Sequence, residues 1–362
     1  MRGFLSRFGQ KGLHLLDPER AHDITIAAMR AGFHSVAAKK DDPRLGVQIL
    51  GQKFPNPIGM AAGFDKNGHV YNPLLKMGFG FAEAGTVTPQ PQAGNKRPRA
   101  FRLKQYKAII NRYGFNNDGI AKLKERLEQA APIGILGINV GANKTTEDKA
   151  VDYAACITAL AKYASFITVN ISSPNTPGLR ALQVGEALDD LLARVVDARN
   201  EVANGNLPTP LLLKIAPDVS EAHLDAIVKS VSDHRIDGMI VSNTTFDRSL
   251  VQGSKQASES GGLSGAPLFE RSTIVLAKTR ERVGPHLPII GVGGISNGLQ
   301  AVQKLEAGAN LIQLYSGLIY GGMPVLDDIK SQMIKALERQ DVSRISVLTS
   351  SDVKDWAAKS LA

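Results

Sequence analysis

Residues 166–175 read Phe-Ile-Thr-Val-Asn-Ile-Ser-Ser-Pro-Asn, an apolar run that passes directly into small polar side chains. The run shows no strict alternation of apolar and polar residues, which is typical of a strand buried on both faces of its sheet. Taken alone, the polar residues at the end of this segment could be ordinary turn residues, which follow most buried strands. Whether they are turn residues or functional groups is decided by how often the same arrangement recurs along the chain.

The same arrangement occurs eight times. The apolar runs are residues 57–61, 79–84, 133–140, 166–171, 211–215, 238–241, 288–292 and 311–314. Segments typical of helices lie between most of them, at residues 121–131, 151–163, 184–204, 220–234, 268–283 and 299–307. Eight buried strands alternating with helices predict an α/β fold, namely a (β/α)8 TIM barrel with a small N-terminal helical extension. An open, doubly wound sheet is the alternative.

Polar or glycine residues follow every one of these runs, where a barrel carries its functional groups. They are Ala61-Ala-Gly-Phe-Asp-Lys66, Gly85-Thr86, Asn139, the segment 170–175, Lys214, Ser242-Asn-Thr244, Gly293-Gly294 and Tyr315-Ser316. The set contains one carboxylate, Asp65, and neither His nor Glu, which excludes a dicarboxylate or histidine metal site. Amides, hydroxyls and two lysines instead favour a planar polar ligand and anions.

Gly293-Gly294 and Ser316 follow the seventh and eighth runs, where barrels commonly bind phosphate through backbone N–H groups. The segment Gly291-Val-Gly-Gly-Ile-Ser296 partly matches a dinucleotide fingerprint. Ser296 stands where that fingerprint has glycine, and the segment lies late in the chain, so we reject a Rossmann interpretation. A flavin with a single phosphate fits better.

Composition limits the remaining function classes. The only cysteine, Cys156, lies in a predicted helix, so neither an intramolecular disulfide nor a thiolate cluster can form. The net charge is +9, but no basic run interleaved with aromatics indicates a nucleic acid partner. No segment approaches the roughly 20 apolar residues of a membrane-spanning helix.

Residues 1–40 predict two short amphipathic helices and contain seven Lys/Arg against three Asp/Glu. Phe4, Leu5, Phe8, Gly12, Leu15 and Leu16 mark the apolar face of the first. Asp17-Pro18 forms a cap for the second, whose apolar face is predicted to carry Ala21, Ile24, Ala28 and Ala31. Such helices either lie on an anionic bilayer surface or pack against the main domain.

The chain thus divides into the helical segment 1–40, a barrel at 41–340 and a tail at 341–362. Two connections, 88–120 and 244–266, are long enough to be lids or binding loops.

The sequence resembles the dihydroorotate dehydrogenases, specifically their membrane-associated, quinone-using class, from about residue 13 to about residue 335. The matching segments are Ala61-Ala-Gly-Phe-Asp-Lys-Asn-Gly68, Arg97-Pro-Arg-Ala-Phe-Arg102, Asn111-Arg-Tyr-Gly-Phe-Asn116, Val169-Asn-Ile-Ser-Ser-Pro-Asn-Thr-Pro-Gly-Leu-Arg180, Val241-Ser-Asn-Thr-Thr245, Gly261-Gly-Leu-Ser-Gly265 and Gly291-Val-Gly-Gly-Ile-Ser296. The resemblance implies oxidation of dihydroorotate to orotate, with FMN as cofactor and a membrane quinone as acceptor. It also implies a peripheral membrane protein on the cytoplasmic face of the bacterial inner membrane.

The resemblance assigns residues as well. The cofactor set is Ala62, Gly63, Phe64, Asp65, Lys66, Thr86, Asn139, Asn170, Lys214, Ser242, Gly265, Gly294, Tyr315 and Ser316. The substrate set is Lys66, Asn111, Arg112, Tyr113, Gly114, Phe115, Asn170, Asn175, Asn243 and Thr244. The quinone set is His22, Arg102 and Tyr315.

Ser173 is the implied general base, where soluble relatives have a cysteine. Its neighbour Ser172 is the residue most easily confused with it, and in an extended chain the two side chains point opposite ways. A serine is a weak base unless another group accepts its proton, and Thr176 with a short water chain is the candidate.

Two rival functions fit parts of the pattern. A phosphate-binding lyase or aldolase would use Lys214 as a Schiff base, and a non-catalytic module would bind a membrane surface.

Overall fold

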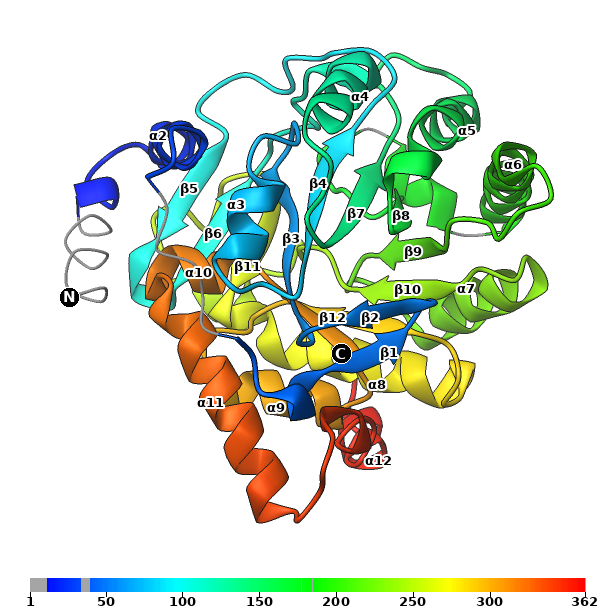
Figure 1. Cartoon of the computed structure of the whole chain (residues 1–362). Helices are drawn as coiled ribbons and strands as arrows, with labels where there is room; N and C mark the ends of the chain where they lie inside the picture. The colour runs from blue at the N-terminus through cyan, green and yellow to red at the C-terminus, as the bar shows by residue number, and fades with distance from the viewer. Residues whose placement is uncertain (1–11, 34–39, 177, 184, 362) are drawn as a thin grey trace.

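The computed structural model describes residues 12–33, 40–176, 178–183 and 185–361, and its centre is a closed barrel of parallel strands (Figure 1). The strands are β3 (Ile58–Asp65), β4 (Phe81–Val87), β7 (Ile135–Val140), β8 (Phe166–Asn170), β9 (Leu211–Ile215), β10 (Gly238–Val241), β12 (Ile289–Val292) and β13 (Leu311–Leu314). Each pairs with the next in chain order, and β13 pairs with β3 to close the sheet. The predicted (β/α)8 barrel is confirmed.

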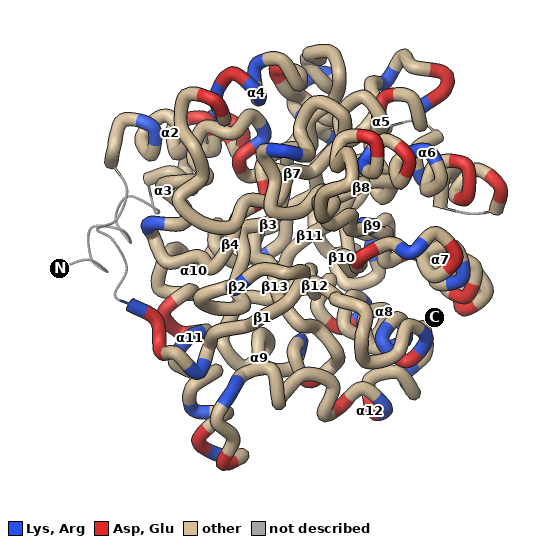
Figure 2. The backbone as a smooth tube through the Cα atoms, turned by 45° about the vertical axis from the view of Figure 1, so that its right-hand side comes forward, with Lys and Arg blue, Asp and Glu red and all other residues tan. Residues whose placement is uncertain are grey.

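Helices surround the barrel. They are α3 (Tyr71–Lys76), α4 (Gly119–Gln129), α5 (Lys149–Leu160), α6 (Gly185–Ala203), α7 (Glu221–Asp233), α8 (Phe269–Val283), α9 (Gly298–Glu306), α10 (Ser316–Gly321) and α11 (Pro324–Arg339). The six helices predicted between the strands all occur, within a few residues of their predicted limits. Figure 2 shows the charged residues gathered on these outer helices and on the loops that join them.

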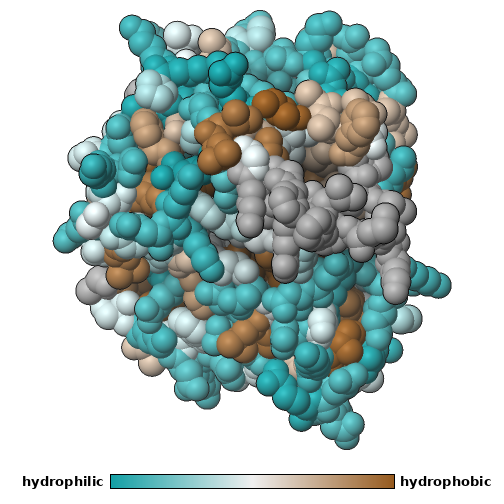
Figure 3. Space-filling model, turned by 90° about the vertical axis from the view of Figure 1, so that its left-hand side faces the viewer, coloured by the Kyte–Doolittle hydropathy of each residue, from teal (hydrophilic) through white to brown (hydrophobic). Residues whose placement is uncertain are grey.

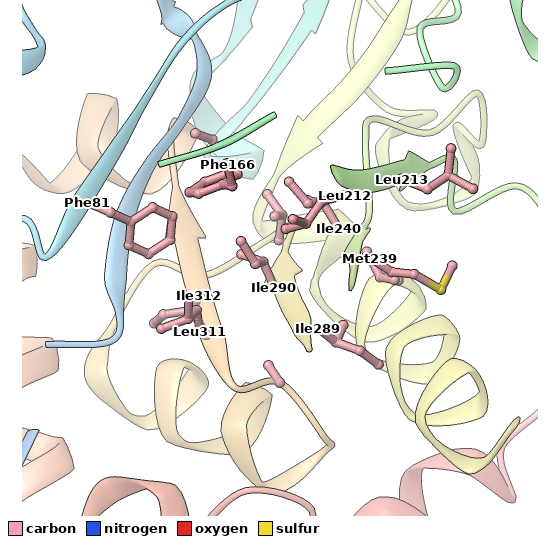
Figure 4. Close-up of a cluster of buried hydrophobic side chains, with 14 of the residues drawn as sticks. Phe81, Phe166, Leu212, Leu213, Met239, Ile240, Ile289, Ile290, Leu311 and Ile312 are labelled. Atoms are coloured by element: carbon pink, nitrogen blue, oxygen red, sulfur yellow. The ribbon is translucent and has the colours of Figure 1, made fainter. Parts of the chain in front are cut away.

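Two phenylalanine rings fill part of the barrel interior. The rings of Phe81 and Phe166 meet edge to face, with 6.1 Å between their centroids, and aliphatic side chains such as Ile290 lie beside them (Figure 4). A Cβ on Gly59 would lie 2.3 Å from Cζ of Phe81, and a Cβ on Gly137 would lie 2.3 Å from Cζ of Phe166. Glycine at these two positions therefore makes the room that each ring occupies.

A hairpin that the sequence interpretation missed packs against these rings. Its strands are β1 (Val47–Ile49) and β2 (Gln52–Phe54), and both turn residues, Leu50 and Gly51, have positive φ (54° and 68°). A two-residue type I′ turn requires this conformation. The buried ring of Phe54 contacts Phe81 edge to face at 5.4 Å, so the hairpin seals the apolar interior.

The two long connections form one sheet. The connection 88–120 carries β5 (Ala100–Leu103) and β6 (Ala108–Asn111), and the connection 244–266 carries β11 (Gly262–Gly265). β6 pairs antiparallel with both neighbours, in the order β11-β6-β5. These strands were not predicted, because each is only four residues long and β11 pairs with a strand in a distant connection.

The C-terminal tail packs against the barrel helices. It contains α12 (Val353–Ala357), and the ring of Trp356 contacts that of Phe269 on α8 at 6.2 Å. The N–H of Ser350 also donates to the carbonyl of Leu305 on α9, at 3.1 Å. The tail therefore supports the two helices that flank the end of β12.

Near the N-terminus, α2 (Pro18–Arg30) begins as predicted at the Asp17-Pro18 cap. The Asp17 carboxylate accepts hydrogen bonds from the backbone N–H groups of Glu19 (3.0 Å) and Arg20 (3.1 Å). The part of the predicted first helix that contains Phe4, Leu5 and Phe8 lies outside the described residues.

The predicted apolar face of this second helix was only partly right. Ala21 is buried as predicted, but Ile24 is 49% exposed, Ala31 is exposed, and Met29, which was not predicted, is buried. The buried side instead includes the charged residue Glu19, whose carboxylate accepts bonds from Arg99 at 2.6 Å and Arg97 at 3.0 Å. This ion pair fixes the rotation of the helix, and an apolar count could not detect it.

We predict that Glu19→Gln loosens α2. Removing one partner of a buried ion pair leaves the other charge unpaired, at a cost of about 3–5 kcal/mol. Hydrogen–deuterium exchange across residues 18–30 should accelerate, while the barrel strands keep their protection. Asp23→Asn is the matched control, because Asp23 is 61% exposed and 3.8 Å from Arg97; exchange that accelerates equally in both variants would contradict the prediction.

The same pair predicts a pH dependence. Burial raises the pKa of Glu19, but hydrogen bonds from Arg99 and Arg97 outweigh it and leave the pKa below its ordinary 4.5. The stabilisation is therefore complete above pH 4.5 and is lost as the pH falls through the lowered pKa. Glu19→Gln should abolish this acid-induced loosening of α2.

Candidate active site

A continuous cavity of about 470 Å³ lies at the C-terminal ends of the barrel strands and is bounded on one side by α2. Most of the predicted site residues line it. They are His22, Ala62, Gly63, Phe64, Lys66, Thr86, Arg102, Asn111, Tyr113, Gly114, Phe115, Asn170, Ser173, Asn175, Lys214, Ser242, Asn243, Thr244, Gly265, Gly294, Tyr315 and Ser316. The structure therefore gathers residues from seven of the eight strand ends around one space; β7 contributes none of the lining residues.

Three predicted residues do not line this cavity. The buried carboxylate of Asp65 accepts hydrogen bonds from the N–H groups of His69 and Val70, both at 2.7 Å, and so holds the turn after β3. Arg112 pairs with Glu259 at 2.6 Å and covers the ring of Phe101 at 4.6 Å. The side-chain polar groups of these two residues are thus engaged by protein partners, and their contact with a ligand stays a prediction.

The third, Asn139, lies one layer below the cavity. Its Oδ1 accepts from Thr86 Oγ1 at 2.6 Å and from Asn170 Nδ2 at 3.1 Å. Both partners line the cavity, and Asn170 Nδ2 also donates to Thr86 Oγ1 at 3.0 Å. Asn139 therefore orients two cavity side chains, and its own contact with a cofactor stays a prediction.

Below Asn139 is a buried carboxylate that the sequence interpretation missed, Glu83 on β4. It accepts hydrogen bonds from Thr168 Oγ1 (2.6 Å), Gln313 Nε2 (2.5 Å) and Asn139 Nδ2 (3.3 Å). The sequence did contain a signal for this residue, namely a glutamate inside the apolar run Phe81-Ala-Glu-Ala84. Glu83 was missed because it lies within the strand, and only the strand ends were considered as functional positions.

The two adjacent serines have different surroundings. Ser172 is fully buried, where its Oγ donates to Asn170 Oδ1 at 2.8 Å and accepts from Asn243 Nδ2 at 2.9 Å. Ser173 lines the cavity, and its Oγ accepts only a longer bond, 3.3 Å, from the N–H of Asn175. Ser173 is thus the serine of the pair that lines the cavity, and its hydroxyl is the less engaged by protein partners.

Lys66 joins the polar part of the cavity to α2. Its Nζ donates to the carbonyl of Gly63 at 2.8 Å, lies 3.4 Å from His22 Nε2, and sits 4.6 Å from the centre of the Tyr113 ring. Burial lowers the pKa of Lys66 to about 8. Burial and the neighbouring Lys66 charge also hold the pKa of His22 well below 6.5, so the imidazole is neutral at physiological pH.

Aromatic contacts continue from α2 to the last strand. The ring of Phe64 meets His22 edge to face at 5.5 Å and Tyr315 at 5.9 Å. Tyr315 donates its hydroxyl hydrogen to the carbonyl of Gly63 at 3.3 Å. Beyond them the cavity is lined by largely apolar residues, among them Leu13, Pro18, Ala21, Met29, Leu318 and Met323. The cavity therefore has a polar half at the barrel rim and an apolar half beneath α2.

Glycines at the ends of β11 and β12 bring backbone close to backbone. Gly294 has φ +76°, and a Cβ there would lie 2.3 Å from the backbone N and Cα of Phe269 at the start of α8. Gly265 has φ +99°, and its Cβ would lie 2.3 Å from the carbonyl oxygen of Lys107. These contacts leave the first turn of α8 close to the cavity wall, an arrangement that suits a phosphate.

Polar atoms without protein partners also point to a ligand. Asn116 Oδ1, Thr244 Oγ1 and Gln313 Oε1 are buried, belong to lining residues, and have no hydrogen-bond partner among the described residues. Buried polar groups are normally paired. In the described ranges, no group of three or more His, Cys, Asp or Glu is arranged to hold a metal ion.

The fold and the cavity define a (β/α)8-barrel enzyme. The polar half of the cavity has room for a cofactor, and an apolar channel begins beside it. Residues 44–337 match the family model for dihydroorotate dehydrogenase, and the chain belongs to that family of oxidoreductases, which convert dihydroorotate to orotate in pyrimidine biosynthesis. This membership decides against the lyase and the non-catalytic module.

Relatives in other organisms agree over the whole chain. The enzyme named dihydroorotate dehydrogenase (quinone) from Brucella melitensis biotype 2 is 51% identical over 363 residues, covering 100% of both chains, and that from Brucella ovis is 50% identical with the same coverage. A crystal structure of the Eimeria tenella enzyme in complex with ferulenol has a TM-score of 0.89 and 34% identity, covering 93% of this chain and 96% of that one.

We predict that Gly294→Ala is more damaging than Gly284→Ala. Both glycines have positive φ, but a Cβ at Gly284 (φ +71°) would meet nothing within 4 Å. The control therefore carries only backbone strain, about 1–3 kcal/mol, whereas Gly294→Ala must also move the backbone of Phe269. Thermal unfolding should show the larger loss for Gly294→Ala; equal losses would mean that the close approach tolerates a methyl group.

Proposed function

We propose that this chain oxidises (S)-dihydroorotate with FMN as the bound cofactor and passes the electrons to a membrane quinone. The observation that carries the proposal is the continuity of the cavity from a polar rim to an apolar channel. A hydrophilic substrate and a lipid-soluble acceptor need such different environments, and both must reach one cofactor.

The residues present fit FMN. The glycines at 265, 293 and 294 together with Ser316 would hold its phosphate, and Thr86, Asn170 and Lys214 offer donors and acceptors to a planar ring. When bound, FMN accepts the hydride that leaves C6 of dihydroorotate. Lys214 is buried within the barrel, where its ammonium group would stabilise negative charge that develops on the ring.

The substrate would lie among amides. Asn111, Asn175 and Asn243 line the polar half of the cavity, and Asn175 Nδ2 lies 3.4 Å from Asn111 Oδ1. These groups match the alternating N–H and C=O groups of a pyrimidine ring, and the buried Thr244 Oγ1 still has a free bonding position. Lys66 would pair with the substrate carboxylate. The negative charge of the carboxylate favours the protonated amine, so it would raise the pKa of Lys66, which burial lowers.

Ser173 would act as the general base that takes the proton from C5. Ser173 lines the cavity, whereas the hydroxyl of Ser172 is hydrogen-bonded to Asn170 and Asn243. The serine needs an acceptor for its own proton. Thr176 is buried three residues further on, and its Oγ1 has no partner among the described residues, so we assign it as the next acceptor.

We predict that Ser173→Ala retains bound flavin but slows its reduction by dihydroorotate by about 10²–10⁴-fold, the usual contribution of a general base. Anaerobic stopped-flow absorbance measures this step directly. Ser172→Ala is the matched control and should lose less than about tenfold, because its hydroxyl orients two asparagines without taking the proton. Reduction of the Ser173→Ala variant at the wild-type rate would reject the assignment.

The quinone would enter beneath α2. His22 and Arg102 line the cavity there with Tyr315, and Arg102 donates to the carbonyl of Leu16 at 2.6 Å. A neutral imidazole and a guanidinium offer hydrogen bonds to the carbonyl oxygens of a quinone ring. The apolar lining suits the rest of the molecule.

The entrance would face a membrane. Leu15, Leu16, Ile24 and Phe33 are large apolar residues that are exposed near this end of the chain. Figure 3 shows hydrophobic side chains next to the grey segment, on a face that is otherwise largely hydrophilic. Within the described residues, no helix has the length and apolar character needed to span a bilayer. We propose peripheral binding through residues 1–40 to the anionic cytoplasmic face of the bacterial inner membrane.

We predict that Ala21→Trp blocks quinone turnover without slowing flavin reduction by dihydroorotate. Ala21 is buried and lines the apolar half, so an indole there fills the proposed channel. Steady-state turnover with a short-chain quinone in detergent should fall by about tenfold or more, equivalent to 1.4 kcal/mol. Ile24→Trp adds the same bulk on the exposed side of α2 and is the control; unchanged turnover in Ala21→Trp would reject the channel.

A further inference from the structure

Lys304 on α9 is a buried lysine that the proposed reaction does not use. Its side chain is 0% exposed, and its Nζ donates to Ser272 Oγ on α8 at 2.7 Å. The ring of Phe269 lies 5.2 Å from the same nitrogen. Burial holds the pKa of Lys304 well below its ordinary 10.5, and no carboxylate counteracts this effect.

Several other buried or nearly buried cations of the described chain pair with anions: Arg99 with Glu19, Arg199 with Asp237 and Lys330 with Asp41, each at 2.7 Å or less. Buried Arg280 has no carboxylate partner but donates to the carbonyls of Gly308, Gly284 and Leu287, and buried Lys214 lines the cavity. The three N–H donors of the Lys304 ammonium group have a single acceptor among the described residues, the hydroxyl of Ser272. Burying a charge is costly unless it is paired, so the position requires an explanation beyond packing.

The surroundings of Lys304 lead directly to the cavity wall. Ser272 Oγ donates to the carbonyls of Gly293 and Phe269, both at 3.1 Å. A Cβ on Gly293 would lie 2.7 Å from that same oxygen. Gly293 lines the cavity, and Phe269 begins the helix whose first turn touches Gly294. The ammonium group is therefore separated from the proposed phosphate position by one hydroxyl and one glycine.

We propose that Lys304 is a positioning residue that supplies the counter-charge for the cofactor phosphate from behind the cavity wall, acting through Ser272. The inference rests on the proposed function, because it requires a phosphate at this end of the cavity. A charge need not touch its partner to act where protein rather than water lies between them. The arrangement would also make the site selective for FMN over riboflavin, since a flavin without a phosphate is not stabilised by the charge of Lys304.

The test compares FMN with riboflavin. We expect Lys304→Met, which keeps the length of the side chain and removes the charge, to weaken FMN binding by about tenfold or more, an effect equal to 1.4 kcal/mol. Riboflavin affinity should stay within about twofold of wild type, because its binding does not involve the phosphate charge. Flavin release on dilution of the holoprotein, followed by fluorescence, gives the FMN value, and reconstitution of the stripped protein gives both.

Two further variants guard against a folding defect. Ser272→Ala should weaken FMN binding in the same selective way but by less, and combining it with Lys304→Met should add little to the effect of Lys304→Met. Lys330→Met removes a partly buried lysine that does not line the cavity. This variant should change the affinity for neither FMN nor riboflavin. Circular dichroism establishes that each variant is folded; if Lys304→Met does not fold, the selectivity of Ser272→Ala decides.

The outcomes are distinct. Equal weakening of FMN and riboflavin, or unchanged FMN affinity, would overturn the role of Lys304. Failure of the wild-type protein to bind either flavin would instead overturn the proposed function.

Discussion

The active site depends on the closure of one sheet. Ile312 of β13 lies opposite Ile58 of β3, and this pairing joins the last barrel strand to the first. Because all eight strands are parallel, closure brings their carboxyl ends to one rim. Residues far apart in sequence then become neighbours, as when Tyr315 donates to the carbonyl of Gly63, 252 positions earlier. Without closure, the polar strand ends would be unrelated turns.

A layer of buried polar groups separates that rim from the apolar interior. Glu83 is at its centre, and its carboxylate accepts hydrogen bonds from side chains on β7, β8 and β13. A buried carboxylate is tolerated only when it is well bonded, and here the bonds also fix the amides above it. Burial lowers the pKa of Lys214, and the negative charge of Glu83 raises it. The glutamate therefore helps Lys214 to remain charged inside the barrel.

Much of this could be predicted from the sequence, since local pattern determines it. The strands buried on both faces, the outer helices and the Asp17 cap all follow from residue type and spacing. The antiparallel sheet of β5, β6 and β11 could not, because its strands are only four residues long and β11 belongs to a different connection from β5 and β6. The rotation of α2 depends on Arg99, 80 positions from Glu19. For Asp65 and Arg112, the sequence indicated the right neighbourhood but not that protein partners already occupy their polar groups.

The pairing of β6 with β11 has a consequence for how such a chain can change. It joins Asn111 to Gly262 and Ala108 to Gly265, so two loops inserted after different strands form a single roof over the polar half of the cavity. An insertion or deletion within either strand would shift this register and move cavity residues on both loops at once. Evolutionary drift in loop length should therefore be confined to the turns outside the paired segments, and residues on the two loops should covary.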